Sequence, residues 1–309
     1  MTINKMLDEI YEIPDSAIRF WDQSEPYILP LKVPYLGMGS SYFAPLAFKY
    51  MNVDIYPELA SEYYNYMAGK SKQPNGVILS QSGRSSEALW CAGLFDKFVA
   101  ITNDPDSELC QCNGVEKSVL MLAGHEDYSS SKTYINTLLT LFKGFGFDVR
   151  DSLGLLRNKM GEYEEKGEKM AGEVFDLIKK KKIHGIYITG SGPNIATAFE
   201  SSLILSESTK MCFTGLPMAQ YDHGPKETAA GSIVIQIIAK GNSYERARKL
   251  NEVITKAGAY VITVEEPQTE ENFSVMHNMI PFNFMAYYLA RKLDIRETFV
   301  VGGKVTEVC

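Results

Sequence analysis

The stretch Val77-Ile78-Leu79-Ser80-Gln81-Ser82-Gly83-Arg84-Ser85-Ser86-Glu87 joins a short apolar run to a cluster of hydroxyl side chains and one glycine. An apolar run bounded by turn residues predicts a buried strand, and residues 85–94 suit the helix that follows it. Hydroxyl groups and backbone amides at the start of a helix favour binding of an anion such as phosphate. The stretch contains no lysine, which excludes the nucleotide-triphosphate loop, because that loop requires Gly-Lys-Ser/Thr.

Strand-like and helix-like segments alternate along the 309 residues, which predicts an α/β protein with mainly parallel sheets. Each half begins with a strand that runs into a glycine–serine turn, at 37–41 and at 190–192. We therefore predict a duplication, with two doubly wound sheets over about 20–145 and 170–309 and a connecting helix over 151–170. The expected strands are 34–37, 53–56, 77–79, 98–102 and 119–122 in the first half and 185–190, 232–239 and 259–264 in the second. Residues 58–68 are expected to be helical.

The net charge, the apolar runs and the cysteine content of the chain argue against several classes of protein and site. A net charge of −7 argues against broad nucleic-acid binding, which needs a basic face. The N-terminus does not resemble a signal peptide, and every apolar run is shorter than the roughly 20 residues that cross a bilayer, so we expect a cytoplasmic protein without membrane contact. Five cysteines fit reduced thiols, and Cys110 and Cys112 are too close together for a usual zinc site.

The carboxyl ends of strands are where open α/β sheets bind ligands, at the point where the strand order reverses. The turn at 37–41 and the loop at 80–83 both fall at such ends, so we expect one anion to contact both. The corresponding stretch of the second half is Lys240-Gly241-Asn242-Ser243. The phosphate-type loop is therefore expected in one half only.

Two titratable residues are candidates for chemistry. Glu207 lies on an expected helix over 195–209 with largely apolar neighbours, and a carboxylate at an apolar edge can have a raised pKa and move protons near neutral pH. His223 lies in a loop shaped by a glycine and a proline. A solvated surface glutamate and an ordinary turn histidine are the alternatives, and the residues alone leave them open. His277, in a methionine-rich segment, is expected to serve packing.

Six stretches in this order resemble motifs of the tandem sugar isomerase (SIS-domain) family. They are 37–42 (Gly-x-Gly-Thr-Ser-Tyr in the family), 80–85 (Ser-Gln-Ser-Gly-Glu-Thr), 129–134, 198–207, 223–225 (His-Gly-Pro) and the lysine element 304–306. The resemblance covers nearly the whole chain. It is strongest to the isomerase half of glucosamine–fructose-6-phosphate aminotransferase and to glucosamine-6-phosphate deaminases of the same fold. It implies two tandem SIS domains, each a doubly wound sheet flanked by helices.

The resemblance also implies roles for individual residues. The 6-phosphate of a phosphorylated hexose or amino sugar would be held by Ser41, Ser80, Gln81, Ser82 and Ser85, and Ser129 would contact the sugar mostly through its backbone. Glu207 would move a proton between C1 and C2. His223 would assist ring opening from the partner subunit of a homodimer, and Lys304 would close over the open-chain sugar. No metal or organic cofactor is implied.

Several positions depart from the family pattern. Ile204 and Ser206 replace two lysines, Asp222 replaces a basic residue before His-Gly-Pro, and Arg84 replaces an acidic residue and is expected to add positive charge near the anion. Thr2 stands where a glutaminase would have its cysteine, so we expect the hydrolytic reaction, from glucosamine 6-phosphate and water to fructose 6-phosphate and ammonia. The alternatives are a fructosamine-6-phosphate deglycase and a non-catalytic sugar-phosphate-binding regulator. The presence of the glutamate, histidine and lysine together favours an enzyme.

Overall fold

The computed structural model describes residues 3–302, with side chains from residue 5. The chain forms two compact units that interleave along the sequence. The β1–β5 unit contains residues 13–126 and 132–149. The β6–β9 unit contains residues 3–12, 127–131 and 150–300. A segment of five residues, 127–131, thus belongs to the β6–β9 unit although the chain on both sides of it belongs to the other.

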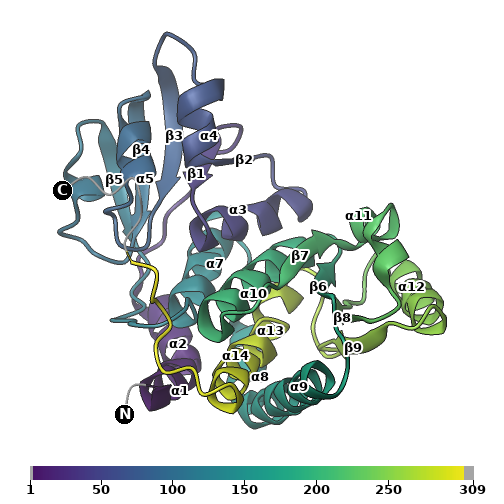
Figure 1. The fold of residues 1–309 in the computed structure, drawn as a ribbon. Coiled ribbons are helices and arrows are strands. Elements are labelled where there is room, and N and C mark those ends of the chain that lie inside the picture. Colours follow the sequence, from purple (N-terminus) through teal and green to yellow (C-terminus); the bar gives the residue numbers. More distant parts are fainter. Residues whose placement is uncertain (1–2, 303–309) are drawn as a thin grey trace. The chain divides into compact units, whose positions relative to one another are not determined.

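The sheet of the β1–β5 unit is fully parallel, with the order β2-β1-β3-β4-β5 (Figure 1). The chain leaves β1 for β2 on one side and later returns to β3 on the other. The strand order therefore reverses between β1 and β3, where Leu36 is paired with Ile78. The strands are β1 Pro34–Gly37, β2 Tyr56–Leu59, β3 Gln73–Leu79, β4 Phe95–Thr102 and β5 Val115–Leu120.

Helices cover both faces of this sheet. One face packs Ile78 and Phe98 against Ala88 and Cys91 of the helix that follows β3. On another side of the core, Phe48 meets Phe142 with ring centroids 4.7 Å apart. The helices of this unit are α2 Ile13–Gln23, α3 Ser40–Tyr50, α4 Ala60–Glu62, a π-helix Tyr63–Met67, α5 Ser86–Ala92, α6 Glu108–Gln111 and α7 Lys132–Gly144.

Two expected strands are displaced. The second expected strand, 53–56, is wrong in position: Asn52 adopts a left-handed φ of 64°, and β2 begins at Tyr56, which pairs with Pro34. Pro57 lies within this edge strand, where a residue without an N–H is tolerated. The helix expected over 58–68 is accordingly shorter and partly π-helical. Strand β5 lies earlier than the expected 119–122 and ends before Leu122, whose φ is 51°.

The β6–β9 unit has a second parallel sheet with the order β7-β6-β8-β9, which repeats the order of the first four strands of the other sheet. Its strands are β6 Gly185–Gly190, β7 Thr214–Pro217, β8 Ser232–Ile237 and β9 Tyr260–Val264. Its helices are α1 Ile3–Tyr11, α8 Arg150–Asn158, α9 Met160–Lys180, α10 Asn194–Thr209, α11 Met218–Asp222, a 3-10 helix Pro225–Thr228, α12 Tyr244–Lys256, α13 Ser274–His277 and α14 Ile280–Lys292. None of the helices within residues 3–302 combines the length and hydropathy needed to span a bilayer.

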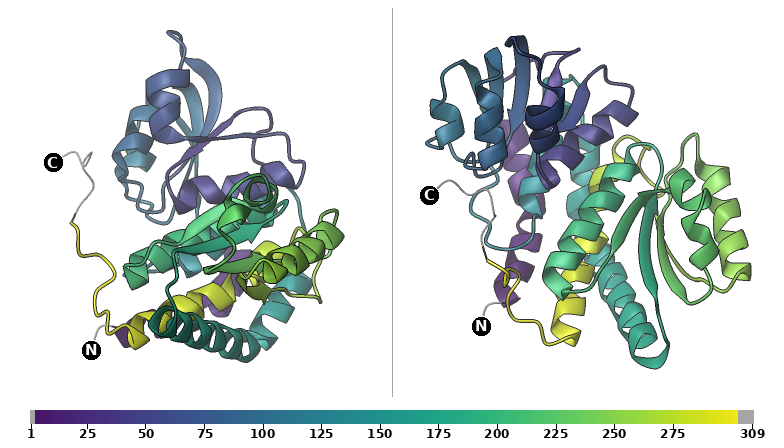
Figure 2. Two further views of the ribbon diagram at one scale, coloured as in Figure 1. Left: turned by 45° about the vertical axis from the view of Figure 1, so that its right-hand side comes forward. Right: turned by 45° about the horizontal axis from the view of Figure 1, so that its top comes forward.

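The connecting helix expected over 151–170 is instead part of a core. Helices α8 and α9 occupy this region, and α9 lies alongside α14 (Figure 2). Gly167 permits the approach, because a methyl group there would lie 2.6 Å from the carbonyl oxygen of Pro281. The buried face of α9 includes Met170, Ala171 and Val174. Apolar burial along one stripe therefore makes this charged segment a structural member of the β6–β9 unit.

Candidate functional site

Two loops of the β1–β5 unit leave neighbouring strands at the point where the strand order reverses. One joins β1 to α3 and the other joins β3 to α5, and β1 is hydrogen-bonded to β3. Because parallel strands end at the same edge of a sheet, the two loops share that edge. This is the general ligand-binding position of open α/β sheets.

The loop after β3, residues 80–85, gathers three hydroxyl side chains. Ser80 is buried, and its Oγ donates to Ser85 Oγ at 3.1 Å. Ser85 is the N-cap residue of α5. The backbone N–H of Arg84 donates to Ser82 Oγ at 3.3 Å. The hydroxyls are thus ordered by one another and by the loop backbone, which suits them to bind an anion.

Backbone packing determines the shape of this loop. Gly83 has a φ of 63°, and a methyl group there would lie 2.1 Å from Ser107 Oγ. The carbonyl oxygen of Gln81 accepts hydrogen bonds from Thr102 Oγ1 at 3.1 Å and from the N–H of Asn103 at 2.9 Å. Only glycine fits the left-handed and crowded position without strain. Residues at the C-terminal end of β4 and just after it therefore hold the loop in this shape.

The expectation that Arg84 adds positive charge near the anion is corrected by its ion pairs. Its guanidinium contacts Asp104 at 2.8 Å and Glu108 at 3.1 Å, and the side chain is 57% exposed. The fork of an arginine suits two carboxylates at once. The positive charge of Arg84 is therefore balanced by two carboxylates of the same unit.

Ser41 lies in the first turn of α3, on the neighbouring loop. It is half-buried, and its N–H donates to the carbonyl oxygen of Met38 at 3.1 Å. A methyl group at Gly37 would lie 2.4 Å from the carbonyl oxygen of Ser41, so the helix starts in direct contact with the end of β1. Gly39, with a φ of 52°, makes the intervening turn.

Glu207 lies near the C-terminal end of α10 in the β6–β9 unit and is half-buried. Burial raises the pKa of its carboxyl group, while a hydrogen bond from Ser129 and the positive charge of Lys210 oppose that rise. Ser129 is buried, and its Oγ also lies 2.9 Å from Ser208 Oγ. The segment 127–131 therefore brings Ser129 to the carboxylate, 78 residues away in the sequence.

His223 is exposed and is the C-cap residue of α11. Its backbone N–H donates to the carbonyl oxygens of Ala219 and Gln220, both at 3.2 Å. Ion pairs with Lys226 at 3.0 Å and Arg246 at 3.1 Å keep the pKa of the neighbouring Asp222 below its usual value. Lys304, the remaining residue with an expected catalytic role, lies outside the described residues.

The strand order of the second sheet reverses between β6 and β8, and a carboxylate lies at that point. A methyl group at Gly241 would lie 2.1 Å from Cδ of Glu271, and one at Gly192 would lie 3.3 Å from its Oε1. Negative charge at this position disfavours a phosphate. The two sheets thus differ at their equivalent edges, with hydroxyls at one and a carboxylate at the other.

A buried polar network in the β6–β9 unit was not anticipated. Lys159 Nζ lies 3.0 Å from both oxygens of Glu266, and Tyr163 OH donates to Glu266 at 3.0 Å. His277 joins Tyr163 OH (2.8 Å to Nδ1) to Ser152 Oγ (2.7 Å to Nε2). Burial lowers the pKa of His277 to about 4. In the sequence, the i, i+4 spacing of Lys159 and Tyr163 was the only local signal of this network.

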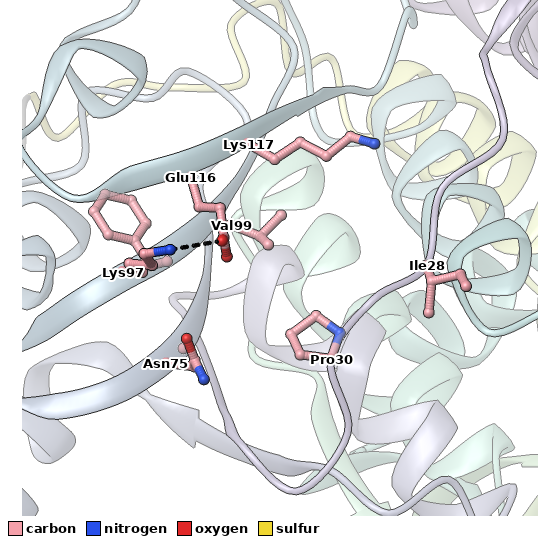
Figure 3. Close-up of a pocket in the computed structure, with 9 residues that line it drawn as sticks. Ile28, Pro30, Asn75, Lys97, Val99, Glu116 and Lys117 are labelled. Atoms are coloured by element: carbon pink, nitrogen blue, oxygen red, sulfur yellow. Dashed lines mark hydrogen bonds and ion pairs between the residues drawn. The ribbon is translucent and has the colours of Figure 1, made fainter.

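A hollow of about 360 Å³ lies in the β1–β5 unit (Figure 3), and no residue of the serine loop 80–85 lines it. It is bordered by Asn75, Lys97 and Lys117, and Lys97 pairs with Glu116 at 3.2 Å. Asn75 precedes Ser80 by five residues of an extended strand, which separates them by about 16 Å. Across residues 3–302, no group of three or more His, Cys, Asp or Glu side chains is arranged to hold a metal ion.

Comparison with known proteins gives relatives along almost the whole chain, although no family model matches. The glutamine–fructose-6-phosphate aminotransferase (isomerizing) of Pyrobaculum aerophilum is 26% identical over 92% of this chain and 54% of its own length. That of Sulfolobus acidocaldarius is 28% identical over 90% of this chain and 50% of its own length. The chain spans about half the length of these curated relatives.

Solved structures share the fold. A glucosamine-6-phosphate deaminase from Thermotoga maritima has a TM-score of 0.72 at 18% identity, covering 93% of this chain and 94% of that one. The C-terminal domain of glucosamine-fructose-6-phosphate aminotransferase from Francisella tularensis has a TM-score of 0.73 at 18% identity, covering 93% and 95%. The sequence relatives and the fold neighbours therefore agree: this chain is similar in sequence to glutamine–fructose-6-phosphate aminotransferases over about half of their length, and it shares the fold of solved SIS-domain phosphosugar isomerases.

Proposed function

We propose that this chain is an aldose–ketose isomerase that acts as a deaminase, converting glucosamine 6-phosphate and water to fructose 6-phosphate and ammonia. The names of the sequence relatives contain fructose 6-phosphate and isomerization, and one structural neighbour is a glucosamine-6-phosphate deaminase. Water is the only co-reactant that this direction needs. We also propose that the chain consists of two tandem SIS domains, at about 20–145 and 170–309, which the repeated strand order supports.

The observation that carries the proposal is the environment of Glu207. The reaction begins when a base removes the proton from C2 of the open-chain amino sugar while O1 gains a proton, which leaves an enolamine. The same group then returns the proton to C1 as the amine loses one N–H proton, and water hydrolyses the resulting C2 imine to a ketone and ammonia. A carboxyl group whose pKa is raised by burial can accept and return a proton near neutral pH, and Ser129 orients it.

The hydroxyl-lined loop would bind the phosphate at the other end of the sugar. Ser80, Ser82 and Ser85, with Ser41 from the neighbouring loop and the side chain of Gln81, would donate hydrogen bonds to its oxygens. Hydrogen bonds to an anion are worth roughly 1.5–3 kcal/mol each, so three or four would anchor the substrate without an arginine or lysine. The pairing of the Arg84 guanidinium with two carboxylates supports this reading.

His223 and Lys304 would complete the chemistry. His223 is exposed on its own unit, which supports a role in the site of a partner subunit within a homodimer. Lys304 would close over the open-chain sugar. Mixed dimers of Glu207→Gln and His223→Ala chains should regain part of the activity that each variant lacks. If the mixed dimers regain no activity, the shared site is rejected.

The decisive experiment measures ammonia release from a panel of amino-sugar phosphates and fructosamine 6-phosphates. Glucosamine 6-phosphate should release ammonia, and Glu207→Gln should reduce kcat about 10³-fold while fructose 6-phosphate still binds. Glu252→Gln, at an exposed position of α12, is the matched control and should keep full activity. Release of a free amino acid from a glycated substrate would identify a deglycase instead. Binding without turnover would identify a regulator, and a fully active Glu207→Gln variant would reject the base.

A further inference from the structure

We propose that Lys210 is a positioning residue that fastens the C-terminal segment to the end of the helix that carries Glu207. The inference rests on the proposed function for its catalytic consequence, whereas the attachment itself can be tested without turnover. Lys210 is the C-cap residue of α10 and adopts the left-handed conformation, with φ 60° and ψ 19°. Its Nζ donates to the carbonyl oxygen of Glu207 at 2.6 Å and also to the carbonyl oxygen of Thr298.

The end of a helix is a natural place for this contact. The last carbonyl groups of a helix have no partner within it, and the helix dipole makes this end negative. An ammonium group has three donors, so it can bind carbonyl oxygens from two segments at once. Lys210 therefore joins α10 to a segment 88 residues further along the chain.

Apolar burial does not hold the C-terminal segment in place. Phe299, Val300 and Val301 are 57%, 58% and 99% exposed. The ion pair between Arg296 and Asp294, at 3.7 Å, is itself highly exposed and contributes little. The contact from Lys210 therefore restrains the backbone at Thr298.

Lys210 also acts on the proposed base electrostatically. Its positive charge lowers the pKa of the Glu207 carboxyl, in the same direction as the hydrogen bond from Ser129 and against the effect of burial.

The test compares Lys210→Met, Lys210→Arg and the control Lys256→Met, which removes a lysine from the last turn of α12. In Lys210→Met, kcat should fall about tenfold, as expected for the loss of a hydrogen bond from a charged group, while KM for glucosamine 6-phosphate stays within about twofold. The acidic limb of the kcat/KM profile should move to higher pH, because the lost charge raises the pKa of Glu207, whose carboxylate form is the base. Lys210→Arg should restore most of the lost kcat and most of the original pH profile.

Amide hydrogen exchange over residues 294–302 gives a readout that needs no activity. Exchange should be faster in Lys210→Met than in the wild type, and unchanged in Lys256→Met. Equal exchange in both methionine variants would overturn the attachment. Faster exchange with an unchanged pH profile and kcat would overturn the positioning role. A wild-type protein that turns over no sugar phosphate would reject the proposed function alone, since the exchange result would still decide the attachment.

Discussion

Replacing Gly83 by alanine should destabilise the β1–β5 unit by about 2–5 kcal/mol. A left-handed backbone conformation costs an L-residue roughly 1–2 kcal/mol, and φ at this position is 63°. The new methyl group would lie 2.1 Å from Ser107 Oγ and 2.3 Å from Ser107 Cβ, and overpacking of this kind costs about 1–3 kcal/mol. The loop that orders Ser80 and Ser82 would have to shift, so KM for a sugar phosphate should rise as well.

A second substitution separates the two contributions. Ser107 is buried, and its Oγ has no hydrogen-bond partner among the described residues, so Ser107→Gly removes the clash and loses no hydrogen bond. The double variant Gly83→Ala/Ser107→Gly should recover about 1–3 kcal/mol relative to Gly83→Ala, which leaves the conformational strain. Ser107→Gly alone supplies the reference for the cycle.

Urea unfolding followed by tryptophan fluorescence suits this measurement. Both tryptophans of the chain, Trp21 and Trp90, belong to the β1–β5 unit, so their emission reports on the unit that contains the substitution. A loss below about 1 kcal/mol in Gly83→Ala would refute the conformational argument. A double variant no more stable than Gly83→Ala would refute the steric one.

Three other substitutions test the network and the loop. His277 has a pKa of about 4 in the folded protein against about 6.5 when unfolded, so the free energy of unfolding of the wild type should fall by up to about 3 kcal/mol as pH falls from 6.5 to 4. His277→Asn should lack this pH-dependent share in urea titrations at pH 7 and 5. An equal fall in stability in both proteins would contradict the prediction. Arg84→Ala should change the free energy of unfolding by less than about 1 kcal/mol, because the ion pairs of Arg84 are exposed. It should nevertheless raise KM severalfold, because two carboxylates near the loop lose their partner. The control Lys97→Ala, which also breaks an exposed ion pair, should leave KM unchanged. Ser80→Ala combined with Ser82→Ala should raise KM at least tenfold with a smaller effect on kcat, and an unchanged KM would remove these hydroxyls from the phosphate site.

Local signals predicted the parallel α/β class and the position of the serine loop. Apolar runs, glycine-rich turns and helix starts each depend on a few neighbouring residues, so they can be recognised directly in the sequence. The same reasoning placed the second strand wrongly, because strand β2 is defined by its register with β1, and Tyr56 pairs with Pro34 across 22 residues. It also treated 151–170 as a connector, since the apolar stripe of α9 has meaning only against α14.

Sequence alone determined which residues carry hydroxyl, carboxyl and imidazole groups, and at which strand and helix ends they stand. The tertiary structure alone decided the burial, the partners and the pKa of those groups. Arg84 meets carboxylates 20 and 24 residues away, Ser129 meets Glu207, and Lys210 meets Thr298. The physical reason is that backbone preferences are local, whereas burial, ion pairing and the resulting pKa depend on groups that only folding brings within a few ångströms.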